Sequence, residues 1–342
     1  MSSRRLATPP IAAARPIELR PRGDFVEWLG TSGGTLAVTT YNSGKLALLS
    51  APAGELVASF WKFPRPMGLA RSGTRLALAS RDHFWDFHIV PHSEPAAPAS
   101  GQIVPTTVHA TGRLDAHDVA FDRRGPLFAN TRFNCVARSS DRVHFRRVWR
   151  PAFMQETPAT LAVDCCHLNG IGVRGGQLEM ATAFCEQAAP AAWRGGDRFH
   201  SGVLVDVLHD RVAARGLCLP HSPRWDAGRW WLCDSGRGTL AIFDPLREAC
   251  DPAIELPGFT RGLTFVGSRA VVGLSRIRQR HILDAPPVRD RWPRLRSGLS
   301  LVDHARGVET GALEFVRGGR EVFDVAFLPQ VAAAVLTESA AN

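Results

Sequence analysis

Three histidines are the residues of this chain with the clearest capacity for chemistry. His117, His167 and His221 recur at intervals of about fifty residues. Neutral imidazoles bind zinc, iron and copper, and a set of three leaves a coordination position open for water or substrate. The pattern therefore predicts a divalent transition metal (Zn, Fe or Cu) held by these side chains. The alternative is structural: each histidine only satisfies backbone groups where a strand begins.

Two carboxylates accompany the histidines in the repeat pattern described below. Asp115 lies two residues before His117, and Glu321 lies at the corresponding place in the last repeat. A carboxylate beside metal-bound imidazoles can complete the ligand set, orient a ligand or accept a proton from the substrate. Asp115 and Glu321 are therefore the predicted catalytic residues.

Four further polar residues are predicted to bind the substrate. They lie near the histidines in the repeats or in neighbouring motifs: Arg132, Arg150, Asn169 and Arg261. A guanidinium group binds a carboxylate through two parallel hydrogen bonds, so the three arginines favour an anionic molecule. A salt bridge between neighbouring repeats is the competing interpretation for Arg132 and Arg150.

The elements that must position these residues are short strands. Runs rich in Val, Leu, Ala and Phe alternate with glycine-containing turns, and helical periodicity is hard to find. The strands group in fours, and one position at the start of the groups recurs every 51 residues or so: Gly68, Asp118, Gly170, Arg224, Gly262 and Asp324. Four-stranded repeats at this period predict an all-β fold, a β-propeller of four-stranded blades.

The number of blades depends on how the chain ends. Six groups of strands, the first beginning at Phe25–Leu29, are followed by two more strands, Val322–Leu328 and Val331–Leu336. This count favours seven blades, and a six-bladed ring with an atypical end is the alternative. We expect Ile17–Arg20 to add a strand to the last blade, so that N- and C-terminal strands close the ring and cover its sheet edges.

The first strand of each blade is predicted to line a central channel with alternate side chains. Residues three positions before each recurring residue form one layer: Arg65, Asp115, His167, His221, Phe259 and Glu321. Residues one position before it form a second layer: Met67, His117, Asn169, Pro223, Arg261 and Phe323. The predicted metal ligands and catalytic carboxylates should therefore converge around the axis.

The formal charge of +9 is concentrated in two segments. Residues 1–22 carry five Arg and one Glu, and residues 275–296 carry seven Arg and two Asp. The first segment is predicted to be a disordered basic tail, followed by a single propeller domain over residues 23–337. The second is predicted to be an Arg-rich loop that reaches for an acidic protein partner. Nucleic-acid binding is disfavoured, because neither segment interleaves its arginines with aromatic residues.

The sequence also predicts where the protein works. It has no uninterrupted apolar stretch of about eighteen residues, the length expected of a membrane-spanning helix. The apolar run after Arg4 and Arg5 is short and broken by two prolines, unlike the core of a signal peptide. We therefore expect a cytoplasmic protein without membrane contact.

Eight motifs along most of the chain resemble those of a known family. They are Pro66–Ala70, Asn130–Cys135, Trp149–Phe153, His167–Gly170, Pro220–Trp225, Asp234–Gly238, Pro257–Leu263 and Gly273–Arg276. On these motifs the chain resembles the DUF4915 family of bacterial proteins. The resemblance implies a propeller-like fold and no settled activity. The Arg-rich segment departs from the less basic loop expected of that family.

Two functions therefore remain open at the level of sequence. The first is a metal-binding enzyme that acts on a small anionic molecule or peptide at the central channel, by hydrolysis, elimination or oxidation. The second is a non-catalytic propeller that binds a partner protein or peptide through its face and its basic loop. Metal analysis of the purified protein separates the two.

Overall fold

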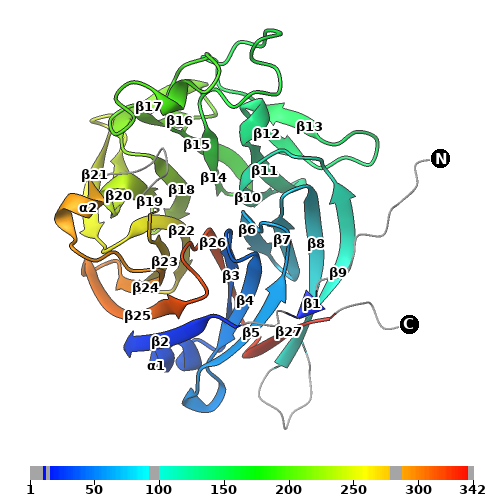
Figure 1. The fold of residues 1–342 in the computed structure, drawn as a ribbon, viewed down its shortest axis with the longest axis vertical. Helices are drawn as coiled ribbons and strands as arrows, with labels where there is room; N and C mark the ends of the chain where they lie inside the picture. Colours follow the sequence, from blue (N-terminus) through cyan, green and yellow to red (C-terminus); the bar gives the residue numbers. More distant parts are fainter. Residues whose placement is uncertain (1–10, 13–15, 92–99, 278–286, 338–342) are drawn as a thin grey trace.

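The strands form a closed ring of sheets around a central axis (Figure 1). The structure is a computed structural model that describes residues 11–12, 16–91, 100–277 and 287–337. Within these residues there are six sheets, and the innermost strand of each packs against the innermost strands of both neighbours. The prediction of an all-β propeller with four-stranded blades is confirmed.

The strands of each blade follow one another from the channel outward. Blade 1 consists of β26 (Asp324–Leu328), β3 (Thr35–Thr40), β4 (Lys45–Ser50), β5 (Val57–Lys62) and β1 (Ile11–Ala12). Blade 2 consists of β6 (Leu69–Ser72), β7 (Arg75–Ala79), β8 (His83–Pro91), β9 (Ser100–Ala110) and β27 (Ala333–Leu336). Blade 3 consists of β10 (Ala116–Asp122), β11 (Gly125–Asn130), β12 (Cys135–Arg138) and β13 (Arg146–Trp149).

The other half of the ring follows the same plan. Blade 4 consists of β14 (Leu168–Arg174), β15 (Gln177–Ala183), β16 (Gly202–Asp206) and β17 (Arg211–Leu217). Blade 5 consists of β18 (Pro220–Asp226), β19 (Arg229–Asp234), β20 (Thr239–Asp244) and β21 (Ala249–Glu255). Blade 6 consists of β22 (Phe259–Val266), β23 (Arg269–Ser275), β24 (Gly298–Asp303), β25 (Val308–Arg317) and β2 (Glu18–Gly23).

The described residues form six blades rather than the favoured seven, because the two C-terminal strands do not start a new blade. Strand β26 pairs with β3 and becomes the innermost strand of blade 1. Strand β27 pairs in parallel with β9, on the outer edge of blade 2. Closure therefore joins the two ends of the chain within one sheet, and it covers edges that would otherwise stay unpaired.

The predicted first strand, Phe25–Leu29, is a helix. Helix α1 (Phe25–Thr31) buries Phe25 and Leu29, which lie four residues apart and therefore share one helical face. Strand β26 takes the innermost position in blade 1, which this segment was expected to fill. Apart from α2 (Val288–Arg291), the remaining helices among the described residues are single 3₁₀ turns: η1 (Pro52–Gly54), η2 (Thr131–Phe133), η3 (Ala192–Arg194) and η4 (Ser235–Arg237). No helix in the described residues has the length and apolar character needed to cross a membrane.

Part of the predicted basic tail is an ordered strand. Residues 18–23 form β2, which pairs antiparallel with β25 on the outside of blade 6, and Ile17 just before it is buried. The predicted partner of this segment was the last pair of strands, so the expected closing strand exists but joins another blade. Residues 1–10 and 13–15 of the predicted tail lie outside the described residues.

Three charged side chains meet in the middle of the channel, one from every second blade. Arg224 donates to both carboxylate oxygens of Asp118, at 2.9 and 3.0 Å, and lies 3.8 Å from the carboxylate of Asp324. At the recurring sequence position the other three blades carry glycine: Gly68, Gly170 and Gly262. A Cβ on Gly68 would lie 2.7 Å from the backbone of Asp118, so the alternation lets neighbouring inner strands approach closely around the charged cluster.

Candidate functional site

A cavity of about 390 Å³ opens at one end of the channel, and we call it the channel-mouth cavity. All six residues of the first predicted layer line it: Arg65, Asp115, His167, His221, Phe259 and Glu321. Three residues of the second layer also line it: His117, Arg261 and Phe323. The repeat pattern therefore brought together the three histidines, both predicted catalytic carboxylates and one predicted substrate-binding arginine.

The other three predicted substrate-binding residues do not line the cavity. Asn169 is buried, and its Oδ1 accepts a hydrogen bond from Thr182 at 2.8 Å. Arg132 donates to the backbone carbonyls of Ala162 and Arg113, at 3.1 and 3.3 Å. Arg150 forms an ion pair of 2.6 Å with Glu156. Arg150 therefore forms a salt bridge, but with the segment that follows its own blade and not between neighbouring blades as the alternative predicted.

His117 and His221 occupy equivalent places in blades 3 and 5. The Nδ1 atom of each lies within hydrogen-bond distance of the carbonyl two residues earlier, at 2.7 Å for His117 and 3.0 Å for His221. Each Nδ1 also contacts a hydroxyl from the 3₁₀ turn after the second strand, Thr131 at 2.8 Å and Ser235 at 2.9 Å. Since a carbonyl can only accept, Nδ1 carries the proton and Nε2 keeps a free lone pair.

This equivalence differs from the predicted one, which placed His221 in the same layer as His167. The pairing of β18 with β19 is irregular between His221 and Arg224. Blade 3 has an irregularity of the same size, between Ala116 and Val119, so Arg224 lies two residues beyond the place in blade 5 that corresponds to Asp118. A fixed offset along the sequence therefore misaligns the layers by two residues in this blade.

Both of these imidazoles are held neutral. Burial lowers the pKa of His117 well below its usual value, and the nearby positive charge of Arg261 acts in the same direction. Burial likewise lowers the pKa of His221, with Arg261 the largest charge effect. His117 keeps some exposure to the cavity, so its neutral ring can contact a bound molecule. At neutral pH the two rings offer lone pairs and no charge.

His167 forms a pair with Asp164, a residue that the sequence interpretation missed. The carboxylate of Asp164 lies 2.6 Å from Nδ1 of His167 and also accepts the backbone N–H of His167 at 2.9 Å. The ring is enclosed by Trp193, Phe184 and His117, with centroid separations of 4.2, 4.5 and 4.7 Å. A carboxylate that orients an imidazole in this way is the arrangement found around histidine bases. The Asp-x-x-His spacing was the available signal.

Four strained backbone positions lie at this end of the channel. Arg65, Asp115, His167 and Leu219 all have positive φ values between 47° and 53°, although none of them is glycine. Left-handed backbone at such residues costs free energy, and the carbonyls of Asp115 and Leu219 are the ones that hold the two neutral histidines. The strained positions therefore orient imidazoles, which supports a functional interpretation of the cavity.

Arg261 is a positively charged residue of the cavity, and its guanidinium lacks a hydrogen-bond partner at one N–H group. It lies on β22 at an irregularity in the pairing with β23, next to Gly262 with φ +74°. Its guanidinium stacks over the ring of Phe323, 3.3 Å from the centroid. Burial lowers the pKa of Arg261 to about 10, against the opposing charge of Glu321, so it stays protonated at neutral pH. Its Nη2 is buried and has no hydrogen-bond partner.

The three histidines of the predicted metal centre lie in one cavity, but only two of them are in contact. His117 and His167 are in ring contact, and His221 lines the same cavity. In the described residues, however, no group of three or more His, Cys, Asp and Glu side chains is arranged to hold a metal ion. The three-histidine ligand set therefore stays a prediction.

The Arg-rich segment 275–296 is described in part. Arg291 and Arg296 form ion pairs with Glu255 and Glu309, at 3.2 and 2.6 Å, so these two arginines are engaged within the propeller. Residues 278–286 lie outside the described residues. The acidic protein partner predicted for this segment stays a prediction.

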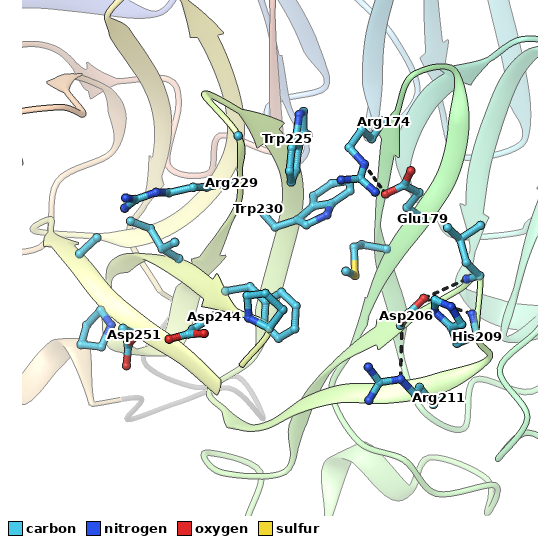
Figure 2. Close-up of a pocket in the computed structure, with 18 residues that line it drawn as sticks. Arg174, Glu179, Asp206, His209, Arg211, Trp225, Arg229, Trp230, Asp244 and Asp251 are labelled. Carbon is cyan, nitrogen blue, oxygen red and sulfur yellow. Dashed lines mark hydrogen bonds and ion pairs between the residues drawn. The ribbon is translucent and has the colours of Figure 1, made fainter. Parts of the chain in front are cut away.

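A larger cavity, of about 620 Å³, lies between blades 4 and 5 (Figure 2). Its blade 4 wall carries charged side chains that pair with one another, including Arg174 with Glu179 at 2.6 Å and His209 with Asp206 at 2.7 Å. Arg174 also stacks over Trp225, 4.5 Å from the ring centroid. Because these pairs satisfy each other, this wall lacks the unmatched polar atoms found at the channel mouth. We therefore take the channel-mouth cavity as the candidate site.

Comparison with known proteins supports the fold and leaves the activity open. A chain in a crystal structure of a nidogen/laminin complex is 13% identical over 87% of this chain and 99% of its own length, with a TM-score of 0.52. A computationally designed protein, Ika8, is 10% identical over 86% of this chain and 78% of its own, with a TM-score of 0.38. No curated protein matches the chain. The model of the family described as a domain of unknown function, DUF4915, matches residues 23–336. The chain therefore belongs to the DUF4915 family.

Proposed function

We propose that the channel-mouth cavity binds a small organic anion through Arg261 and that His167 is the base that accepts a proton from it. The observation that carries the proposal is the buried Nη2 of Arg261, which has no hydrogen-bond partner. An unpaired N–H of a buried cation is costly, and an anionic oxygen is the partner that best removes this cost. A cavity of about 390 Å³ is within the size range of small-molecule sites.

The imidazoles around Arg261 can contact a bound anion. His117 and His221 are neutral, so they can accept hydrogen bonds from the ligand at Nε2 without adding charge. His167 is oriented by Asp164 and presents the same kind of nitrogen. A base held near an anion-binding arginine suits proton abstraction, the step shared by elimination and by hydrolysis with activated water.

Arg261→Gln is expected to weaken binding of the anion by about 10- to 100-fold, the effect of losing hydrogen bonds to a charged group, worth roughly 1.5–3 kcal/mol. Calorimetric titration of the wild-type protein with short carboxylates and inorganic phosphate, ranked first by thermal shift, measures this. Arg317→Gln is the control, because its side chain is 88% exposed on blade 6. The proposal fails if no anion binds, or if Arg261→Gln folds normally and binds equally well.

A divalent metal is a second candidate for the same cavity. The observation that favours it is that Nδ1 of all three histidines is already engaged, which is how proteins orient metal-binding imidazoles. His221 would have to approach the contacting pair of His117 and His167 as the ion binds.

Titration with zinc tests this candidate directly. We expect uptake of about one ion per chain, and at least a tenfold loss of affinity in His167→Ala or His221→Ala, as for the removal of a direct ligand. His209→Ala is the matched control, because this histidine lies in the other cavity. Absence of zinc, iron and copper uptake by the wild-type protein would exclude the metal.

A further inference from the structure

A second guanidinium in the channel-mouth cavity also lacks a partner. Arg276 follows β23, and its Nε is buried without a hydrogen-bond partner. Its position is fixed from both sides: its backbone N–H donates to the carbonyl of Arg320 at 3.0 Å, and the hydroxyl of the preceding Ser275 donates to the carbonyl of Val322 at 3.0 Å. Two different arginines that line one cavity therefore each have a buried N–H group without an acceptor.

The charges around the cavity do not balance. Its lining includes five arginines and three carboxylates: Arg65, Arg113, Arg194, Arg261, Arg276, Asp115, Asp164 and Glu321. His117 and His221 add no charge, because burial lowers the pKa of both. With His167 as the neutral base of the proposed function, the described lining has an excess of two positive charges, which a ligand with two negative charges would neutralise.

Aromatic rings form much of the remaining wall: Tyr41, Phe184, Trp193, Phe259 and Phe323. Their faces suit the apolar part of a ligand, and they lower the local dielectric, which strengthens charge pairing with the two arginines. A bare inorganic ion would make no apolar contact with these rings. The wall therefore favours an organic molecule that carries its charges on a carbon body.

We infer that the ligand is a small organic dianion, a dicarboxylate or a phosphate monoester, whose anionic oxygens are shared between Arg261 and Arg276. This inference rests on the proposed function and extends it from an anion to a doubly charged one. Arg276 is then the residue that selects for the second charge, while Arg261 binds any anion that enters the cavity.

Two matched pairs of ligands separate the second charge from size and shape. Glutarate and pentanoate have the same chain length, and phenyl phosphate and phenyl sulfate have the same ring, but only the first of each pair is a dianion at pH 7.5. In the wild-type protein we expect one of the two dianions to bind at least tenfold more tightly than its monoanion partner. The pair that shows the preference identifies the ligand as a dicarboxylate or a phosphate ester.

Arg276→Gln should abolish that preference by lowering the affinity for the dianion at least tenfold more than the affinity for the monoanion, whereas Arg261→Gln should weaken both. Arg276→Lys keeps the charge and is expected to restore part of the preference. Thermal unfolding without ligand checks that each variant folds. If monoanions bind through Arg261 but neither pair shows a preference, or Arg276→Gln preserves it, the dianion inference is overturned and the proposed function stands. If no anion of either pair binds, both fail.

Discussion

Arg224→Met is expected to lower the free energy of unfolding by roughly 3–5 kcal/mol, the usual cost of removing one partner from a buried ion pair. Arg224 is the cation of the cluster in the middle of the channel, and its guanidinium donates to Asp118 and to the carbonyl of Ile171. Methionine fills similar space but leaves the carboxylates of Asp118 and Asp324 facing each other. Equilibrium unfolding in urea at pH 7.5 measures the loss.

The matched control is Arg317→Met, whose exposed ion pair with Glu18 should contribute less than about 1 kcal/mol. A second measurement identifies the cause. If carboxylate repulsion destabilises Arg224→Met, its deficit should shrink at pH 5, where protonation relieves the repulsion. A deficit that is equal at both pH values would indicate lost packing, and a deficit below 1 kcal/mol would contradict the role assigned to the cluster.

The second large effect is a loss of stability as the pH rises from about 4 to 7, caused by Asp324. Burial raises the pKa of Asp324 to about 7, and the neighbouring charge of Asp118 adds to the shift. The folded protein therefore binds this proton more tightly than the unfolded chain does. The contribution is fully present below the unfolded pKa near 3.8 and is lost as the pH passes through about 7. Each pKa unit corresponds to about 1.4 kcal/mol, so the contribution is on the order of 4 kcal/mol.

Asp324→Asn isolates this contribution. The asparagine has no proton to lose in this range, so the stability of the variant should fall less than that of the wild type between pH 4 and 7. The variant starts from a lower baseline, because Oδ1 and Oδ2 accept from Val325 and Leu69 and the amide can replace only one of these acceptors. Asp141→Asn, at a side chain that is 96% exposed, should leave the slope unchanged. Identical slopes in the wild type and Asp324→Asn would contradict the assignment.

The sequence by itself was sufficient for the repeating part of the fold. Strand alternation and glycine turns are local properties, and the repeat period follows from them, so four-stranded blades and the residues near the channel could be predicted. The whole first layer, from Arg65 to Glu321, lines the observed cavity. The convergence of the three histidines in one cavity followed from the same periodicity.

The number of blades was decided by contacts between the two ends of the chain. Asp324 pairs with Thr39, and Ala333 pairs with Ser100, across most of the sequence. Both C-terminal strands look like the start of a new blade, since strand propensity does not say which edge a strand will join. The helix at Phe25–Thr31 is short, so its single buried face resembled a strand in sequence.

The chemistry of the site was also decided by the tertiary structure. The orienting role of Asp164, the neutral state of His117 and the missing partners of Arg261 and Arg276 depend on burial and on distances between side chains. Arg132 and Arg261 look equally suited to bind an anion in sequence. In the fold, backbone carbonyls accept hydrogen bonds from Arg132, whereas Arg261 lines the cavity and has a buried N–H without a partner. Residue type sets what a side chain can bind, and its folded surroundings set what it still lacks.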